Sequence, residues 1–150
     1  MKKVIAVLTL FVLPFIANAQ ILDPVKWDFS AKKINANTYE LHMKANMEAG
    51  WHVYAQDCGE GPIPTTFTLT NNPLVKLVGK VKENGKLQKT FDKNYKTEMK
   101  YYENHADFVQ TVTLKGKGTT KVKGKVEFMA CDDHQCLPGK EVTFAIVVGR

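Results

Sequence analysis

Residue types that mark several common classes of protein are scarce or missing in this sequence. Its 150 residues hold a single serine, Ser30, and a single arginine, Arg150. There is no Gly-x-Ser-x-Gly elbow, no His-Glu-x-x-His pair and no phosphate-cradling glycine loop, which argues against serine hydrolases, zinc proteases and nucleotide binding. Proteins that read nucleic acids rely on arginine for bidentate and stacking contacts. We therefore expect no nucleic acid among the partners, and we interpret the lysine-based net charge of +6 as a source of solubility.

Long apolar runs are also absent, except for one at the N-terminus. Lys2 and Lys3 precede the apolar run 4–16, and Ala17-Asn18-Ala19 follows it, which is the layout of a cleavable secretory signal peptide. An apolar helix of that length spans about 20 Å, which is shorter than the roughly 30 Å hydrocarbon layer. The sequence thus predicts a signal peptide over 1–19, export to the periplasm, and one domain over 20–150 without membrane insertion.

The exported part shows the period-two alternation of half-buried β-strands. Val25 to Ala31 and Tyr39 to Met47 alternate most clearly. Shorter strand-like runs cover 51–54, 67–69, 74–81, 108–114, 120–130 and 141–148. We expect turns at 35–37 and at Glu83-Asn84-Gly85, irregular chain over 56–64, and a loop with a short strand over 87–102. No stretch has sustained helical periodicity, so the pattern predicts a single-domain, all-β antiparallel sandwich whose tryptophan and phenylalanine side chains form the core.

Three cysteines are too few for a disulfide-rich scaffold, so any bridge needs a specific reason. Cys131 and Cys136 flank four residues that can form a hairpin loop, which would place their Cα atoms about 4.5–5.5 Å apart and permit a disulfide. Closing so small a ring stabilises the fold by only about 2 kcal/mol, whereas an exposed bridge is easily exchanged. From spacing alone, a structural and a redox-active bridge stay equally open. A protonated His134 would favour a departing thiolate, and Asp132 and Asp133 would oppose it.

Three segments together resemble a known family. They are Cys131 to Pro138, the run Gly50-Trp51-His52-Val53-Tyr54, and the stretch 91–102 followed by 108–114. They are similar to the N-terminal periplasmic domain of DsbD-type thiol:disulfide interchange proteins, also called the disulfide bond corrector family. The resemblance implies an immunoglobulin-like sandwich whose cysteine pair relays electrons between thioredoxin-like domains, with no cofactor beyond the disulfide.

The resemblance also implies roles for individual residues. Cys136 matches the cysteine that forms the mixed disulfide with partners, and Cys131 matches its bridging mate. Tyr54 matches an aromatic residue beside the pair, and Phe91 or Tyr95 would supply the aromatic cap. The loop is one residue shorter than in the best-known members, and the membrane-spanning and thioredoxin-like parts do not follow. We therefore expect thioredoxin-like periplasmic proteins and a separate membrane reductase as partners.

Three alternatives accompany this interpretation. The domain is a non-catalytic immunoglobulin-like binding or accessory module if the bridge is structural. Copper or zinc would need Cys131, His134 and Cys136 together with His52 or His105, but the spacing matches no strong zinc signature. Cys58 is extra relative to the family, and we interpret it as a leftover free thiol in preference to a regulatory thiol or an intermolecular bridge.

Overall fold

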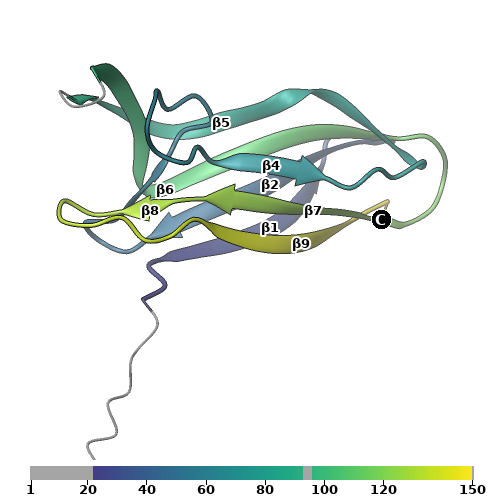
Figure 1. Ribbon diagram of the computed structural model, residues 1–150. Helices are drawn as coiled ribbons and strands as arrows, with labels where there is room; N and C mark the ends of the chain where they lie inside the picture. Colours follow the sequence, from purple (N-terminus) through teal and green to yellow (C-terminus); the bar gives the residue numbers. More distant parts are fainter. Residues whose placement is uncertain (1–21, 93–95, 150) are drawn as a thin grey trace, which may run out of the picture.

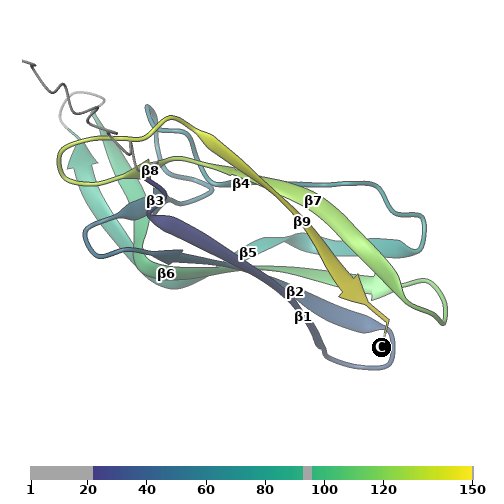
Figure 2. The same ribbon diagram turned by 90° about the horizontal axis from the view of Figure 1, so that it is seen from below.

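The computed structural model describes residues 22–92 and 96–149, which form a sandwich of two β-sheets (Figures 1 and 2). The predicted signal peptide over 1–19 lies outside these residues. The strands are β1 (Val25–Lys33), β2 (Thr38–Met47), β3 (His52–Tyr54), β4 (Thr66–Leu69), β5 (Val75–Asp92), β6 (Thr97–Leu114), β7 (Thr120–Phe128), β8 (Ala130–Cys131) and β9 (Lys140–Val148). No helix capable of crossing a bilayer occurs in the described part of the chain.

All strand pairs are antiparallel, which confirms the predicted immunoglobulin-like sandwich. The larger sheet has the order β1-β2-β6-β3-β8, and the smaller sheet has the order β4-β7-β9. Strand β6 is long enough to pair with β2 through Asn46↔His105 and then with β3 through His52↔Glu103. Strand β5 pairs along the opposite edge of β6. Strands β3 and β8 therefore occupy one end of the larger sheet, beyond the end of β2.

The core lies between the two sheets, as the alternation in the sequence predicts. In β2, every second side chain from Tyr39 to Met47 is buried, because successive side chains of a strand point to opposite faces. Trp51 is buried, and Trp27 packs against four phenylalanine rings with centroids 5.4–6.2 Å away. Phe91 is an exception to the expectation of a core position, because 64% of its surface is exposed.

The prediction of a turn at Glu83-Asn84-Gly85, followed by a loop with a short strand, is wrong. Strand β5 runs without a break through this segment and forms a long hairpin with β6. The pairing register shifts between Val78 and Lys82 and again between Gly85 and Leu87. Each shift changes which side chains face the core, and this erases the period-two pattern. A Cβ at Gly85 would lie 2.9 Å from Cδ1 of Tyr102, so the glycine here marks a close contact between strands instead of a chain reversal.

The predicted strand over 120–130 is divided at Met129. Strand β7 belongs to the smaller sheet, whereas β8 belongs to the larger sheet, so the chain crosses between the sheets immediately before Cys131. Figures 1 and 2 both show the loop that follows β8 at the same end of the sandwich as the end of β5 and the start of β6. This crossing places the two cysteines at an end of the molecule.

Candidate functional site

The two cysteines of the hairpin are joined. Cys131 and Cys136 form an isolated antiparallel bridge and a disulfide, with 4.0 Å between their Cα atoms. This separation is somewhat shorter than the spacing of 4.5–5.5 Å that we expected. The backbone N–H of Asp132 donates to the carbonyl oxygen of Gln135 at 2.9 Å, so residues 132–135 form the predicted four-residue loop.

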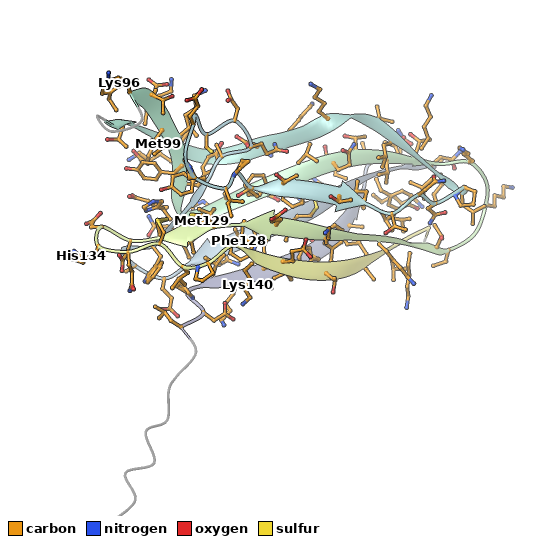
Figure 3. The ribbon with its side chains drawn as sticks, viewed as in Figure 1. Lys96, Met99, Phe128, Met129, His134 and Lys140 are labelled. Carbon is orange, nitrogen blue, oxygen red and sulfur yellow. A yellow bond between two sulfur atoms is a disulfide. The ribbon has the colours of Figure 1, made fainter. Side chains whose placement is uncertain are left out.

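Asp132 organises this loop. Its Oδ1 atom accepts hydrogen bonds from the backbone N–H groups of His134 and Gln135, each at 2.7 Å. These hydrogen bonds to the charged form lower the pKa of the Asp132 carboxyl group. Asp133 and His134 are exposed, and His134 lies at the outer end of the loop (Figure 3). The loop is therefore held by a carboxylate that stays ionised at neutral pH.

The two halves of the disulfide differ in accessibility. Cys131 is 1% exposed, because its side chain packs in an apolar group with Tyr54, Cys58 and Met99 on one face of the larger sheet. Cys136 is exposed, because the chain that follows it does not return to regular structure until β9 begins at Lys140. An incoming thiolate therefore has an open approach from the Cys136 side and none to Cys131.

The site lies on the face of the larger sheet that points away from the core. Ala130, Val53 and Tyr102 point into the core, whereas their chain neighbours point to the opposite face. These neighbours form a second apolar group, which we call the outer-face cluster. It consists of Tyr54, Cys58, Met99 and Cys131, with Tyr101 and Met129 packed against it. Met99 and Met129 are labelled in Figure 3. Strand alternation thus separates the disulfide from the packing that holds the sheets together.

Cys58 belongs to this cluster although it comes from an irregular segment. The hydroxyl of Thr65 donates to the carbonyl oxygen of Tyr54 at 2.6 Å, and the N–H of Lys100 donates to the carbonyl oxygen of Cys58 at 3.3 Å. These bonds hold the predicted irregular segment against β3 and β6. The Cys58 side chain is free and buried, and burial raises the pKa of its thiol. Neither the spacing nor the periodicity of the sequence indicates that this cysteine shares a cluster with Cys131.

The aromatic residues that the resemblance assigns to the site differ in where they lie relative to the outer-face cluster. Tyr54 is 8% exposed and lies in the outer-face cluster with Cys131. Phe91 is on β5, where it pairs in register with Glu98, and most of its ring faces solvent. Tyr95 lies outside the described residues. The buried hairpin side chain of the cluster is instead Met99, with Tyr101 packed against it. Sequence reasoning missed Met99 because β6 shows no clear period there. The role of Phe91 or Tyr95 as a cap stays a prediction.

His52 is the other residue that sequence reasoning missed, except as a metal ligand. It is the register partner of Cys131 across β3 and β8, and its ring centroid lies 4.6 Å from that of Tyr101. Burial lowers the pKa of His52, although the nearby carboxylates Glu103, Asp133 and Asp132 act in the opposite direction. Its position two residues before Tyr54 was the available signal, because both side chains point to the same face of a strand.

The residues of the alternative copper or zinc site do not form a metal-binding group. Within residues 22–92 and 96–149, no three His, Cys, Asp or Glu side chains lie close enough together to hold a metal ion. His105 pairs with Asn46, farther along β6 than the Glu103 that pairs with His52. The groups that do lie close together at the site are the sulfur-containing side chains, the imidazole of His52 and the rings of Tyr54 and Tyr101.

The fold and the site together define an immunoglobulin-like domain with a disulfide in an exposed hairpin. A family comparison is consistent with this class, since the family described as "Thiol:disulfide interchange protein DsbD, N-terminal" matches residues 18–147. The chain belongs to this family, which confirms the resemblance seen in the sequence. Membership implies thiol–disulfide interchange, and the Cys131–Cys136 disulfide is the group that would carry it.

Solved structures show the same fold at low sequence identity. The N-terminal domain of DsbD from Neisseria meningitidis, in the reduced form, matches with a TM-score of 0.56 and 12% identity, over 85% of this chain and 87% of that chain. The N-terminal periplasmic domain of ScsB from Proteus mirabilis matches with a TM-score of 0.55 and 12% identity, over 81% of this chain. The match spans 44% of that ScsB structure. No curated protein sequence matches this chain significantly.

Proposed function

We propose that this protein is a periplasmic thiol–disulfide exchange domain that relays electrons between thioredoxin-like partners through Cys131 and Cys136. The observation that carries this proposal is the unequal exposure of the two cysteines. A disulfide between one exposed and one buried cysteine favours attack by a thiolate at the exposed cysteine, and an exchange reaction through a defined mixed disulfide requires such a preference.

The proposed reaction begins on Cys136. A partner's thiolate attacks Sγ of Cys136, the Cys131–Cys136 bond breaks, and its electron pair leaves on Cys131. The partner's second thiolate then attacks the partner sulfur of the mixed disulfide and releases Cys136. The domain is left as a dithiol and the partner as a disulfide. The dithiol reduces the next protein by the same steps in reverse, so no external oxidant or cofactor is needed.

Two features support the choice of partners and compartment. The family joins this chain to thiol:disulfide interchange proteins, and the ScsB relative is described as a periplasmic domain. The layout of residues 1–19 is that of a secretory signal. We propose thioredoxin-like periplasmic proteins as the exchange partners and a membrane reductase as the source of electrons.

A trapping experiment tests the assignment of the two cysteines. In Cys131→Ala, the remaining Cys136 thiolate should attack a thioredoxin-like partner's disulfide and form a mixed disulfide that Cys131 can no longer resolve. We expect this complex on non-reducing gels, with the linkage at Cys136 established by peptide mass. Cys136→Ala is the matched control, and it should trap nothing because Cys131 is buried. Both variants carry Cys58→Ala, so that no third thiol contributes. A complex linked through Cys131, or no complex with any thioredoxin-like candidate, would contradict the proposal.

A further inference from the structure

The thiol of Cys131, the buried cysteine of the pair, is difficult to deprotonate. When a partner is bound to Cys136, Cys131 is a free thiol, and it must become a thiolate before it can attack Cys136 and release the partner. Its position is 1% exposed. Burial disfavours a thiolate, and the carboxylates of the adjacent Asp132 and Asp133 disfavour it further. The resolving step therefore requires a base at Cys131.

The neighbouring strand places an imidazole at this position. His52 and Cys131 are directly opposed in register, which brings their Cβ atoms to about 4.5–5.5 Å and points both side chains to the outer face. The ring of His52 is held by Tyr101, with centroids 4.6 Å apart, and by Tyr54, with centroids 5.3 Å apart.

The surroundings of His52 suit a group that takes up a proton briefly. Burial lowers its pKa, so the imidazole is neutral and able to accept a proton at pH 7. Three carboxylates then stabilise the imidazolium once it forms. The titratable side chains facing His52 are Glu103 and Tyr101 on β6, Tyr54 on β3, Cys131 on β8, and Asp132 and Asp133 in the loop.

We infer that His52 is the general base that deprotonates Cys131 when the mixed disulfide at Cys136 is resolved. The imidazole accepts the proton from Sγ of Cys131. The new thiolate attacks Sγ of Cys136, the bond between Cys136 and the partner's sulfur breaks, and the electron pair leaves on that sulfur. The imidazolium then returns its proton to the departing thiolate or to water. This role rests on the proposed exchange function and adds to it the residue that controls the second step.

His134 is the competing imidazole, but its position does not suit this role. It lies at the exposed outer end of the loop, and its backbone N–H is used to hold Asp132. Cys131 is instead buried against β3, on which His52 lies. His134→Gln is therefore the matched control for His52→Gln.

The test uses oxidised glutathione as the probe, so that no protein partner is needed. The fully reduced chain is mixed with oxidised glutathione between pH 5 and pH 9 and quenched in acid. Mass spectrometry then follows formation and decay of the glutathione adduct on Cys136. We expect His52→Gln to form the adduct within about twofold of the wild-type rate and to resolve it about 100-fold more slowly at pH 7, the size of a general-base contribution.

The pH profile separates a base from a residue that only packs. In the wild type, resolution should accelerate as pH rises through the lowered pKa of His52 and then level off. In His52→Gln it should continue to rise with hydroxide, so that the two rates converge toward pH 9. His134→Gln should follow the wild type in both steps. His52→Phe, which keeps a ring against Tyr101 and Tyr54, provides the same comparison if His52→Gln does not fold.

Each remaining outcome has a distinct meaning. If His52→Gln resolves its glutathione adduct at the wild-type rate, or more slowly by the same factor at every pH, the role of His52 is overturned. The exchange function is then left intact. A wild-type chain that forms no adduct on Cys136 would overturn the exchange function and, with it, the role of His52.

Discussion

At the scale of single residues, burial decides which sulfur reacts. Cys58 and Cys131 lie in the outer-face cluster, whereas Cys136 is exposed. Because the thiolate is the reactive form and burial disfavours it, the three cysteines of one small domain should differ widely in reactivity.

Cys58 should be nearly inert while the protein is folded. Its thiol is buried and its pKa is raised by burial, so the fraction present as thiolate at pH 8 is small. In the oxidised protein, we expect Ellman's reagent to detect almost no thiol until urea is added, and then one thiol for each chain. In the native reduced protein, Cys136 should react first. Rapid modification of Cys58 in the native oxidised protein would show that the cluster is open.

The spacing of the sequence permits the disulfide and the family resemblance adds Tyr54, but neither indicates that His52 lies opposite Cys131. The spacing from Cys131 to Cys136 and the turn-forming Asp132 are local, so the loop follows from the nearby chain. The contact of His52 with β8 is not local, because it depends on β3 lying beside a strand almost eighty residues later. No periodicity within either segment contains that information.

At the scale of strands, a strand can be recognised from the sequence where its pairing register is regular. Strand β2 pairs in unbroken register with β1 and β6, and its alternation is visible at once. Strand β5 contains two register shifts and pairs only with β6, so the alternation of its core-facing side chains is not constant along the strand. This is why the sequence predicts only a loop with a short strand over 87–102, the part of the β5–β6 hairpin that supplies Met99 to the site.

The smaller sheet depends on a glycine in its central strand. A Cβ at Gly124 of β7 would lie 2.7 Å from the carbonyl oxygen of Thr68 and 2.7 Å from Cζ of Phe144. We expect Gly124→Ala to lower the free energy of unfolding by about 1–3 kcal/mol, the usual cost of overpacking, as measured by urea denaturation. Gly116→Ala is the control, because a Cβ there meets nothing within 4 Å, and it should change stability by less than about 0.5 kcal/mol. Equal urea midpoints for the two variants would contradict this packing.

At the scale of the whole molecule, stability and chemistry occupy different faces of the larger sheet. The core that joins the sheets is built from one set of side chains, and the outer-face cluster is built from their neighbours in the chain. Closing the loop between Cys131 and Cys136 contributes only about 2 kcal/mol to stability. Opening the disulfide therefore leaves the core in place, which a domain that alternates between disulfide and dithiol requires.

The reduction potential of the Cys131–Cys136 pair tests the central claim most directly. The full chain is equilibrated in glutathione buffers of known potential, and the fraction of dithiol is measured after alkylation by mass spectrometry. A disulfide that exchanges with thioredoxin-like partners should have a potential between about −270 and −180 mV. A value below about −300 mV would mean that the disulfide is a structural bridge in a non-catalytic module, and it would contradict the account.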